Sequence, residues 1–398
     1  MKRIAIIFNG NIQDRKGYVN AVVERAKRLY ARKEYSIDVF CLSQYDWWFI
    51  RLLRHTKMCE RLPRIILDEI PIQMIWYPFS LIDYFLSVKF RMKKVVEPFY
   101  IKRVLCQFKD YDLICAHSAV PGTIALHVKN KYNIPYTVTW HGSDIHTEPF
   151  VNNSYRRLVG KVIGGATVNL FVSKKLRDTA RQIFPCIKEV CVSYNGASEM
   201  FYKYEASRVE LIRKKYGLAE NDKVVGFVGG LIPVKNVEIL PDIFNRIKNE
   251  CDYVKFWIIG NGKLKKNIEN KLREKYPNIE CQMFGDQSVE VMPDLMNCID
   301  LLLLPSKNEG LPLVTVEALR CAVNVVASHV GGISEVVGEN NVIDHGDGFE
   351  DRFARRCIEI LRDNEPCPEL PKQFDWDIIV EKESVLYRSM LHNKRLDI

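Results

Sequence analysis

Long apolar runs are missing from this chain of 398 residues, although 47% of its residues are hydrophobic. No stretch reaches the roughly 18 consecutive apolar residues that a membrane-spanning helix requires. The apolar stretch after Lys2 and Arg3 is also too short for the core of a signal peptide. We therefore predict a globular protein of the cytoplasm, with a length that suits two or three domains.

Cysteine pairs of the form C-x-x-C are also missing, although the chain contains 12 cysteines. Several cysteines lie inside apolar segments, as Cys115 and Cys321 do. Such thiols are typically buried and reduced, so the sequence disfavours a disulfide framework and a zinc site. Asp375 and Asp377 form a D-x-D pattern, but they lie at the predicted start of a helix near the end of the chain. We predict that the protein holds no metal ion.

Acidic residues are scarce in the first half of the chain. Residues 1–200 contain 31 lysines and arginines but 17 aspartates and glutamates, a net charge of +14, whereas the net charge of residues 201–398 is −5. This asymmetry predicts that the first half meets an anionic partner, such as a membrane surface, a lipid diphosphate or nucleic acid. Nucleic acid is disfavoured because no recognition motif accompanies the charge.

Strand and helix patterns alternate through the first 200 residues. The apolar run Arg3–Phe8 predicts a strand, and apolar residues at helical spacing predict a helix over residues 19–33. Further apolar runs predict strands at residues 36–42, 113–116, 136–140, 170–173 and 191–192. This alternation is typical of a doubly wound parallel sheet.

Residues 45–109 interrupt the alternation with interleaved aromatic and basic side chains. Among them are Trp47, Trp48, Phe49, Trp76, Tyr77, Tyr84, Phe85, Phe90, Lys89, Arg91, Lys93, Lys94, Lys102 and Arg103. One interpretation is a surface that docks on a membrane or holds a lipid-linked molecule, because such residues favour the headgroup zone. The other is a pair of ordinary helices that pack their aromatic rings into the core.

A second alternation begins after the polar stretch 208–222, which suits a linker or boundary helix. Apolar runs predict strands at residues 224–228, 254–259, 279–284, 301–304 and 324–327, with helices between them. We predict a first domain over residues 1–200, a second domain of the same kind over residues 201–375, and a helical tail over residues 376–398.

Two glutamates bracket the junction between the predicted strand 301–304 and the next helix. Glu309 falls on the loop past the carboxyl end of the strand, and Glu317 falls near the start of the helix, where Pro312 suits the first turn. Ligands of open α/β sheets bind in this crevice. A carboxylate there can accept hydrogen bonds from sugar hydroxyls, and the helix end favours a phosphate. The pattern suits a nucleotide sugar, although a solvated surface pair is the alternative.

Glycines open the turn after the predicted strand 224–228. Gly229 and Gly230 permit close approach of the backbone to a phosphate, and Lys235 can reach its charge. The structural alternative is a tight turn with a solvated lysine.

A second glycine turn, with Gly260 and Gly262, follows the predicted strand 254–259. The third glycine of a dinucleotide fingerprint is missing, because Lys265 occupies its place, so NAD binding is disfavoured. The pair Gly331 and Gly332 marks a further turn after the last predicted strand.

His141 follows the predicted strand 136–140, with Gly142 beside it and Asp144 shortly after. An imidazole at a strand end can donate a hydrogen bond to a sugar or phosphate, and Asp144 can orient the loop. A lone histidine with a structural role is the alternative.

The spacing of Glu309 and Glu317 resembles the donor-site signature of the retaining glycosyltransferases of family 4, which have the two-domain GT-B fold. The turn at Gly229, the H-G-x-D element at His141 and the turn Asn195-Gly196 extend the resemblance along most of the chain. It implies an α/β protein with two Rossmann-like, doubly wound domains that face each other across a cleft, and a C-terminal helix that crosses back to the first domain. Gly230 stands where relatives usually have an arginine, which puts a second cationic contact in doubt.

The resemblance also implies a site. Lys235 would contact the diphosphate, Glu309 would hold or polarise the transferred sugar, His141 would contribute from the first domain, and Glu317 would hold the ribose. The remaining donor-binding candidates are Gly229, Gly230, Gly260, Gly262, Gly310 and Leu311. No cofactor is implied beyond the nucleoside diphosphate sugar, which is the donor substrate.

The function that the resemblance implies is transfer of a hexosyl unit to a glycan or polyprenyl-diphosphate-linked acceptor in polysaccharide biosynthesis, with the protein peripheral at the inner face of the cell membrane. Two alternatives stay open: a nucleotide sugar epimerase on the same fold, which needs no anionic acceptor surface, and a non-catalytic nucleotide-sugar-binding module. A glycosidase with Glu309 and Glu317 as its acid pair is disfavoured, because the phosphate-binding turns would then have no purpose.

Overall fold

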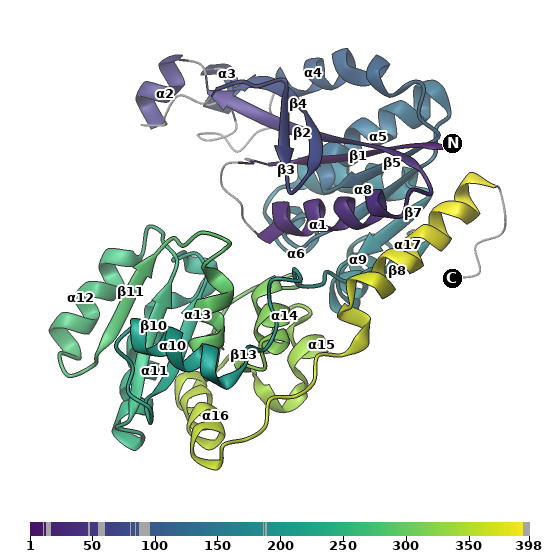
Figure 1. The fold of residues 1–398 in the computed structure, drawn as a ribbon. Helices are drawn as coiled ribbons and strands as arrows, with labels where there is room; N and C mark the ends of the chain where they lie inside the picture. The colour runs from purple at the N-terminus through teal and green to yellow at the C-terminus, as the bar shows by residue number, and fades with distance from the viewer. Residues whose placement is uncertain are drawn as a thin grey trace. The chain divides into compact units, whose positions relative to one another are not determined.

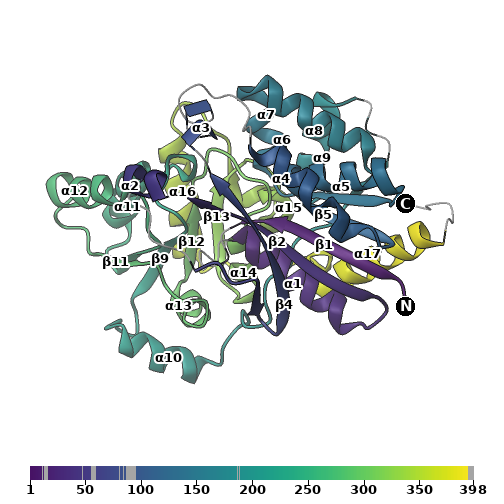
Figure 2. The ribbon, with the colours of Figure 1, turned by 90° about the horizontal axis from the view of Figure 1, so that it is seen from above.

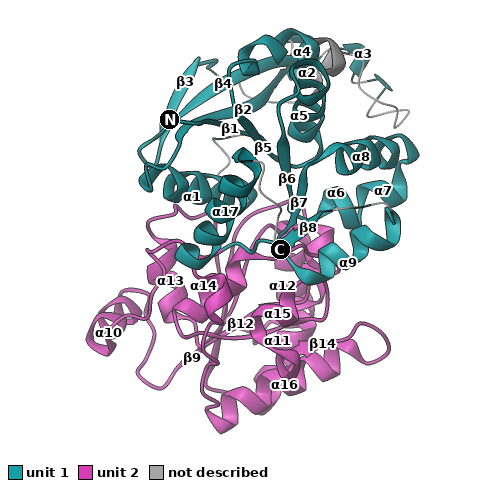
Figure 3. Cartoon of the chain, turned by 90° about the vertical axis from the view of Figure 1, so that its right-hand side faces the viewer, with its two compact units in different colours: residues 1–195, 376–398 teal, residues 196–375 magenta. Residues whose placement is uncertain are grey.

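The computed structural model describes residues 1–10, 12, 17–46, 48–54, 60–79, 81–83, 85–86, 96–185, 187 and 189–392. The chain divides into two compact units (Figures 1 and 3). Unit 1 comprises residues 1–195 and 376–398, and unit 2 comprises residues 196–375. Within the described ranges, no helix combines the length and apolarity of a membrane span. The ten cysteines in these ranges are free thiols.

Unit 1 is built on an eight-stranded sheet in the order β3-β4-β2-β1-β5-β6-β7-β8. Its strands are β1 (Arg3–Asn9), β2 (Ser36–Asp46), β3 (Arg64–Leu67), β4 (Ile70–Phe79), β5 (Leu113–His117), β6 (Tyr136–Trp140), β7 (Val168–Phe171) and β8 (Val190–Val192). All neighbouring pairs are parallel except β3 and β4. Every residue of β5, β6 and β7 is buried, as expected for parallel strands covered on both faces by helices.

The α-helices of unit 1 within the described residues are α1 (Gly17–Ala31), α2 (Trp48–Arg54), α3 (Leu81–Asp83), α4 (Val96–Val104), α5 (Ala119–Tyr132), α6 (Ser143–His146), α7 (Glu148–Val151), α8 (Asn153–Gly165), α9 (Lys174–Ile183) and α17 (Trp376–Leu391). Side-chain caps define where two of them begin. The Asn152 carboxamide oxygen accepts hydrogen bonds from two backbone N–H groups of α8, and Ser173 Oγ accepts one from Leu176 of α9 at 3.1 Å. Such caps satisfy donors that the first helical turn leaves unpaired.

Residues 64–79 form a β-hairpin, so the expectation of two helices over residues 45–109 is wrong for this part. β3 and β4 are antiparallel, and the two residues that join them, Asp68 and Glu69, have φ values of 48° and 70°. Positive φ at both positions is the geometry of the tight turns that match strand twist. β4 also pairs in parallel with β2, and most of its residues are buried.

Within unit 1, a buried arginine joins α17 to α1. Arg25 of α1 forms an ion pair with Glu383 of α17, and both side chains are 1% exposed. Its guanidinium also donates to Ser193 Oγ at 2.8 Å, the Tyr194 carbonyl at 2.8 Å and Asn195 Oδ1 at 3.0 Å. Figures 1 and 2 show α17 alongside α1. Removal of either charge would leave the other buried and unpaired, so this pair specifies where α17 docks.

Unit 2 contains a six-stranded, entirely parallel sheet in the order β11-β10-β9-β12-β13-β14. Its strands are β9 (Lys223–Val228), β10 (Val254–Ile259), β11 (Cys281–Gly285), β12 (Leu301–Leu304), β13 (Asn324–Ser328) and β14 (Val342–Ile343). Its α-helices are α10 (Ala206–Lys215), α11 (Leu240–Glu250), α12 (Lys265–Lys275), α13 (Met292–Cys298), α14 (Leu313–Arg320), α15 (Ile333–Val337) and α16 (Phe349–Asp363). The strands that the apolar runs predicted in this half are all present.

Both sheets contain a central point at which the strand order reverses. In unit 1 the reversal separates β1 from β5, and in unit 2 it separates β9 from β12. The loops after the two strands diverge at such a point, because their helices cover opposite faces of the sheet. The crevice left between these loops is where open α/β sheets bind ligands.

Candidate active site

Lys235 and Glu309 meet at the reversal point of unit 2. Lys235 ends the short 3₁₀ helix Pro233–Lys235 that follows β9, and Glu309 lies on the loop after β12. The Lys235 ammonium lies 2.6 Å from Glu309 Oε1, and their side chains are 21% and 11% exposed. A backbone hydrogen bond of 2.8 Å from Lys307 N–H to the Val234 carbonyl joins the two loops. The structure therefore brings together two of the three predicted catalytic residues.

Ser306, which the sequence reasoning missed, orients Glu309. The Ser306 side chain is fully buried, and its Oγ donates to Glu309 Oε1 at 2.7 Å. Oε1 of Glu309 thus accepts hydrogen bonds from both the Ser306 hydroxyl and the Lys235 ammonium. Among the described residues, the other oxygen, Oε2, receives no hydrogen bond, so it can accept one from a ligand hydroxyl. The signal in the sequence was a hydroxyl directly after the apolar strand.

The loops that contain the predicted glycines pack backbone against backbone around the Lys235–Glu309 pair. Gly260 has a φ of 129°, and a Cβ added there would lie 2.1 Å from the Gly229 carbonyl oxygen. Gly331 has a φ of 56°, and a Cβ there would lie 2.1 Å from the Glu309 carbonyl oxygen. Gly332 N–H also donates to the Gly310 carbonyl at 2.8 Å. The loops after β9, β10, β12 and β13 are therefore joined at one edge of the sheet.

We expect Gly260→Ala to destabilise the protein by about 3 kcal/mol, because the methyl group meets backbone atoms and the positive φ is unfavourable for alanine. Gly230→Ala is the matched control. A Cβ at Gly230 has no neighbour nearer than 3.8 Å. That variant should change the free energy of unfolding by less than about 0.5 kcal/mol. Urea denaturation of both variants checks the difference, and equal stabilities would contradict the close packing of these loops.

Glu317 lies on α14, and its carboxylate makes no hydrogen bond with the Lys235–Glu309 pair or any other described residue. Its side chain keeps intermediate exposure, yet the surrounding protein desolvates the carboxylate and raises its pKa to about 7. A carboxylate in this state gains from any donor that a ligand supplies. Pro312, the cap of α14, also provides no side-chain hydrogen bond to the first turn of the helix. Gly310 and Leu311, two predicted donor contacts, are buried between Glu309 and this cap.

His141 lies in unit 1, directly after β6. Its Nε2 lies 3.1 Å from Nδ1 of His117, the last residue of β5. Desolvation and, to a smaller extent, the charge of Arg25 lower the pKa of His141 to about 3. His141 is therefore neutral at physiological pH. The sequence reasoning missed His117, although its position at a strand end was a signal.

Asp144 lies on α6, shortly after His141, and stabilises the turn that carries His141. The Tyr155 hydroxyl of α8 donates to Asp144 Oδ1. Burial raises the pKa of this carboxyl to about 6, against the opposing effect of the hydrogen bonds it accepts. These bonds orient the turn that carries His141.

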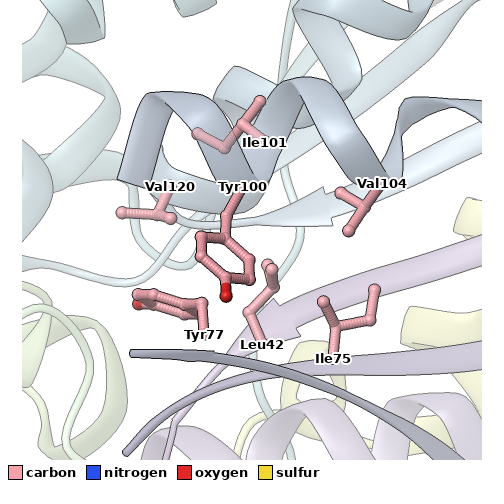
Figure 4. A pocket seen from close by; sticks show the side chains of 7 residues that line it. All are labelled: Leu42, Ile75, Tyr77, Tyr100, Ile101, Val104 and Val120. Carbon is pink, nitrogen blue, oxygen red and sulfur yellow. The ribbon is translucent and has the colours of Figure 1, made fainter. Parts of the chain in front are cut away.

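An apolar pocket in unit 1 has none of these polar groups in its lining. It is lined by Leu42, Ile75, Tyr77, Tyr100, Ile101, Val104 and Val120, and Figure 4 shows Tyr100 from α4 pointing down toward the strands. The lining comes from β2, β4, α4 and α5. It lies between α4 and the sheet, and no charged side chain lines it.

Within the described ranges, no cluster of three or more His, Cys, Asp or Glu side chains could hold a metal ion. The two aspartates of the D-x-D pattern lie on either side of a buried tryptophan. Trp376 is 1% exposed, whereas the Asp377 side chain is 90% exposed and lies 3.5 Å from Arg28. The two aspartates therefore belong to the start of α17.

Comparison with known proteins identifies two family models along the chain. The model described as Glycosyltransferase Family 4 matches residues 19–199, and the model described as Glycosyl transferases group 1 matches residues 208–375. These two segments contain His141 and the Lys235–Glu309 pair, respectively.

Named relatives agree with these matches. The chain is 30% identical over 233 residues to TuaC of Bacillus subtilis, named for teichuronic acid biosynthesis, and the match covers 58% of this chain and 56% of TuaC. It is 29% identical over 320 residues to the glycosyltransferase MJ1178 of Methanocaldococcus jannaschii, with 76% of this chain and 82% of the relative covered. The N-acetyl-alpha-D-glucosaminyl L-malate synthase of Bacillus anthracis is 26% identical over 312 residues, with coverage of 73% and 78%.

Solved structures show the same fold. Anabaena HepE in complex with UDP superposes with a TM-score of 0.73 at 20% identity, covering 98% of this chain and 100% of that one. Sucrose-phosphate synthase from Thermosynechococcus elongatus superposes with a TM-score of 0.75 at 16% identity, covering 99% and 100%. The predicted fold class is therefore confirmed. The chain belongs to the GT-B glycosyltransferases of family 4, with its second half in glycosyl transferases group 1, and it is a glycosyltransferase.

Proposed function

We propose that this protein transfers a hexosyl unit from a nucleoside diphosphate sugar to a glycan or lipid-linked acceptor in polysaccharide biosynthesis, with retention of the anomeric configuration. The observation that carries the proposal is the Lys235–Glu309 pair at the reversal point of the unit 2 sheet, with Ser306 behind it. A cation and a carboxylate at one edge suit a ligand that carries both phosphates and hydroxyls.

Each member of the site has a role in this proposal. Cleavage of the glycosyl phosphate bond develops negative charge on the leaving diphosphate, which the Lys235 ammonium and the amino end of α14 stabilise. Oε2 of Glu309 accepts a hydrogen bond from a hydroxyl of the transferred sugar. Glu317 accepts from the ribose hydroxyls, and the favourable bond offsets the desolvation of its carboxylate.

In this proposal His141 binds the donor and does not accept the proton of the acceptor hydroxyl. A histidine whose pKa is about 3 is a poor general base at neutral pH. The new bond joins the anomeric carbon to the acceptor oxygen, the bond from that carbon to the phosphate oxygen breaks, and the acceptor proton passes to the leaving diphosphate. His141 then contributes a hydrogen bond to the donor.

Purified protein incubated with a panel of nucleotide sugars, with release of free nucleoside diphosphate as the readout, tests the proposal. The panel starts with UDP-glucose, since HepE has been solved in complex with UDP-glucose. Release that depends on an added glycan or lipid acceptor supports transfer. Conversion of one nucleotide sugar into another would instead indicate an epimerase, and binding without turnover would indicate a binding module.

We also propose that the acceptor binds at the basic, aromatic part of unit 1. Helix α2 exposes three large apolar side chains, with Trp48 at 61%, Phe49 at 48% and Leu52 at 66%. Lys89, Arg91, Lys93 and Lys94, which carried the membrane prediction, lie outside the described residues. Exposed aromatic residues beside basic ones favour an anionic membrane surface.

We expect combined neutralisation of Lys89, Arg91, Lys93 and Lys94 to release the protein from anionic vesicles, because each such charge contributes about 1 kcal/mol near an acidic surface. High salt should have the same effect on the natural protein. Sedimentation with vesicles measures both. The control variant neutralises four exposed basic residues of unit 2, namely Lys214, Lys215, Lys266 and Arg273. Equal sedimentation of all three proteins at every salt concentration would remove the membrane from the proposal.

We also expect transfer to continue after treatment with a metal chelator. Lys235 and the amino end of α14 supply the positive charge that a divalent ion would otherwise bring to the diphosphate. Nucleoside diphosphate release is measured with and without the chelator. Loss of activity that magnesium or manganese restores would show that a metal ion takes part.

A further inference from the structure

Two histidines of unit 1 share a single hydrogen bond at the carboxyl edge of its sheet. His117 ends β5, His141 follows β6, and the facing ring nitrogens, Nδ1 of His117 and Nε2 of His141, lie 3.1 Å apart. The two strands are parallel neighbours, with His117 paired to Thr139. His117 is 2% exposed, so its ring is held by protein on nearly every side.

The surroundings of His117 restrain it further. Ser118 has a φ of 77° and a ψ of 175°, a conformation that is unfavourable for a residue other than glycine. It is held there by its N–H, which donates to the Thr139 carbonyl at 3.0 Å, and by its Oγ, which donates to Asn9 Oδ1 at 2.6 Å. Strained residues that persist in this way cluster at functional sites.

Tyr18 of α1 contacts both histidines. Its hydroxyl donates to the His117 carbonyl at 3.0 Å, and its ring lies edge-on to the His141 ring with centroids 4.8 Å apart. The tyrosine therefore limits rotation of the His141 imidazole while it anchors the His117 backbone. His117, Ser118 and Tyr18 come from the strand ends and helices on the two sides of the β1/β5 reversal point, so the group occupies the ligand-binding position of the unit 1 sheet.

The hydrogen bond between the two rings must have one donor and one acceptor. Burial lowers the pKa of both imidazoles, so each ring is neutral and carries one proton. One nitrogen of the facing pair must donate and the other must accept. If His117 donates from Nδ1, His141 carries its own proton on Nδ1 and presents an N–H donor. If His141 donates from Nε2, its Nδ1 is a bare lone pair, which phosphate oxygens would repel.

We propose that His117 is a positioning residue, which donates its Nδ1 proton to His141 Nε2 and thereby holds His141 in the tautomer that offers an Nδ1–H donor to the nucleotide sugar. The hydrogen bond and the orientation belong to unit 1 alone. The effect on transfer rests on the proposed function, in which His141 contacts the donor.

Two variants of the full chain test the role of the hydrogen bond. His117→Asn keeps an amide near the position of Nδ1, whereas His117→Phe keeps a ring of similar size and removes the nitrogen. We expect kcat/KM for transfer to fall about tenfold or more in His117→Phe, because the hydrogen bond that orients His141 is lost, and His117→Asn to recover most of this loss. A packing role predicts the reverse order, since phenylalanine suits a buried site better than asparagine. Activity of His117→Phe equal to or above that of His117→Asn would overturn the proposal.

The tautomer is measured directly by long-range ¹H–¹⁵N NMR of protein labelled at histidine, with His141→Asn and His117→Asn used for assignment. We expect His141 to be protonated on Nδ1 in the natural protein and to shift toward the Nε2–H form in His117→Phe. Protonation of His141 on Nε2 in the natural protein, or no change in the variant, would overturn the proposal. This measurement needs no substrate, so it stands even if no nucleotide sugar is turned over, a result that would instead count against the proposed function.

Discussion

Lys235→Ala should slow sugar transfer by on the order of 100-fold or more, because the variant loses the cation that stabilises the leaving diphosphate. The Lys235 ammonium already lies 2.6 Å from Glu309, so its position is set before the donor binds. A charge that needs no reorganisation during the reaction stabilises a transition state more than a mobile one does. The turnover number for nucleoside diphosphate release, measured at saturating donor, checks this expectation.

Lys307→Ala is the matched control for this experiment. Lys307 is exposed and lies on the loop that Lys235 contacts, with its backbone N–H bonded to the Val234 carbonyl at 2.8 Å. Its replacement removes a nearby positive charge but leaves the Lys235–Glu309 pair in place. We expect a change of a few-fold at most. A turnover number for Lys235→Ala within the range of this control would exclude Lys235 from the mechanism.

Glu317→Gln should weaken donor binding by about 10- to 100-fold. A neutral amide accepts weaker hydrogen bonds from the ribose hydroxyls than a carboxylate does, at a cost of about 1.5–3 kcal/mol. In the natural protein, donor affinity should also fall as the pH drops below 7, because the pKa of the Glu317 carboxyl is about 7 and its protonated form is a poorer acceptor. Calorimetric titration across this pH range measures both effects.

The same substitution should stabilise the unliganded protein at high pH. Folding raises the pKa of Glu317 from near 4.5 to about 7, so the folded chain holds a proton that the unfolded chain releases between these values. Stability therefore falls as the pH rises through this window, and above pH 7 the ionised carboxylate costs about 1–3 kcal/mol, allowing for its partial exposure. Glutamine removes this cost, so the Tm of Glu317→Gln should exceed that of the natural protein at pH 8 but not at pH 4.

Glu369→Gln provides the comparison for both effects, since Glu369 is an exposed acid of unit 2. It should alter neither donor affinity nor the pH dependence of Tm. If Glu317→Gln behaves like this control in the binding experiment, the ribose assignment is wrong. If it behaves like the control in the stability experiment alone, the carboxylate is less desolvated than its surroundings indicate.

Local patterns were sufficient for most of the fold. A strand of a parallel sheet that is buried on both faces must be apolar throughout, so runs such as Leu301–Leu304 and Val254–Ile259 were visible without tertiary information. Turn glycines at Gly229 and Gly260 also marked the strand ends. At Gly260 the contact with the Gly229 carbonyl leaves no room for a side chain. The hairpin at residues 64–79 was missed, since β4 includes Trp76, Tyr77 and Phe79, and aromatic residues suit a helix core as well as a strand.

The amino-acid order alone therefore placed Lys235, Glu309 and His141 at strand ends, because strand position follows from hydrophobic runs of a few residues. Pairing across space had no such local pattern. The hydrogen bond between His117 and His141 and the buried Arg25–Glu383 ion pair each join residues that parallel strand order or helix docking brings together. The pKa of Glu317 likewise depends on how much water the surrounding protein removes, and that quantity exists only once the chain is packed.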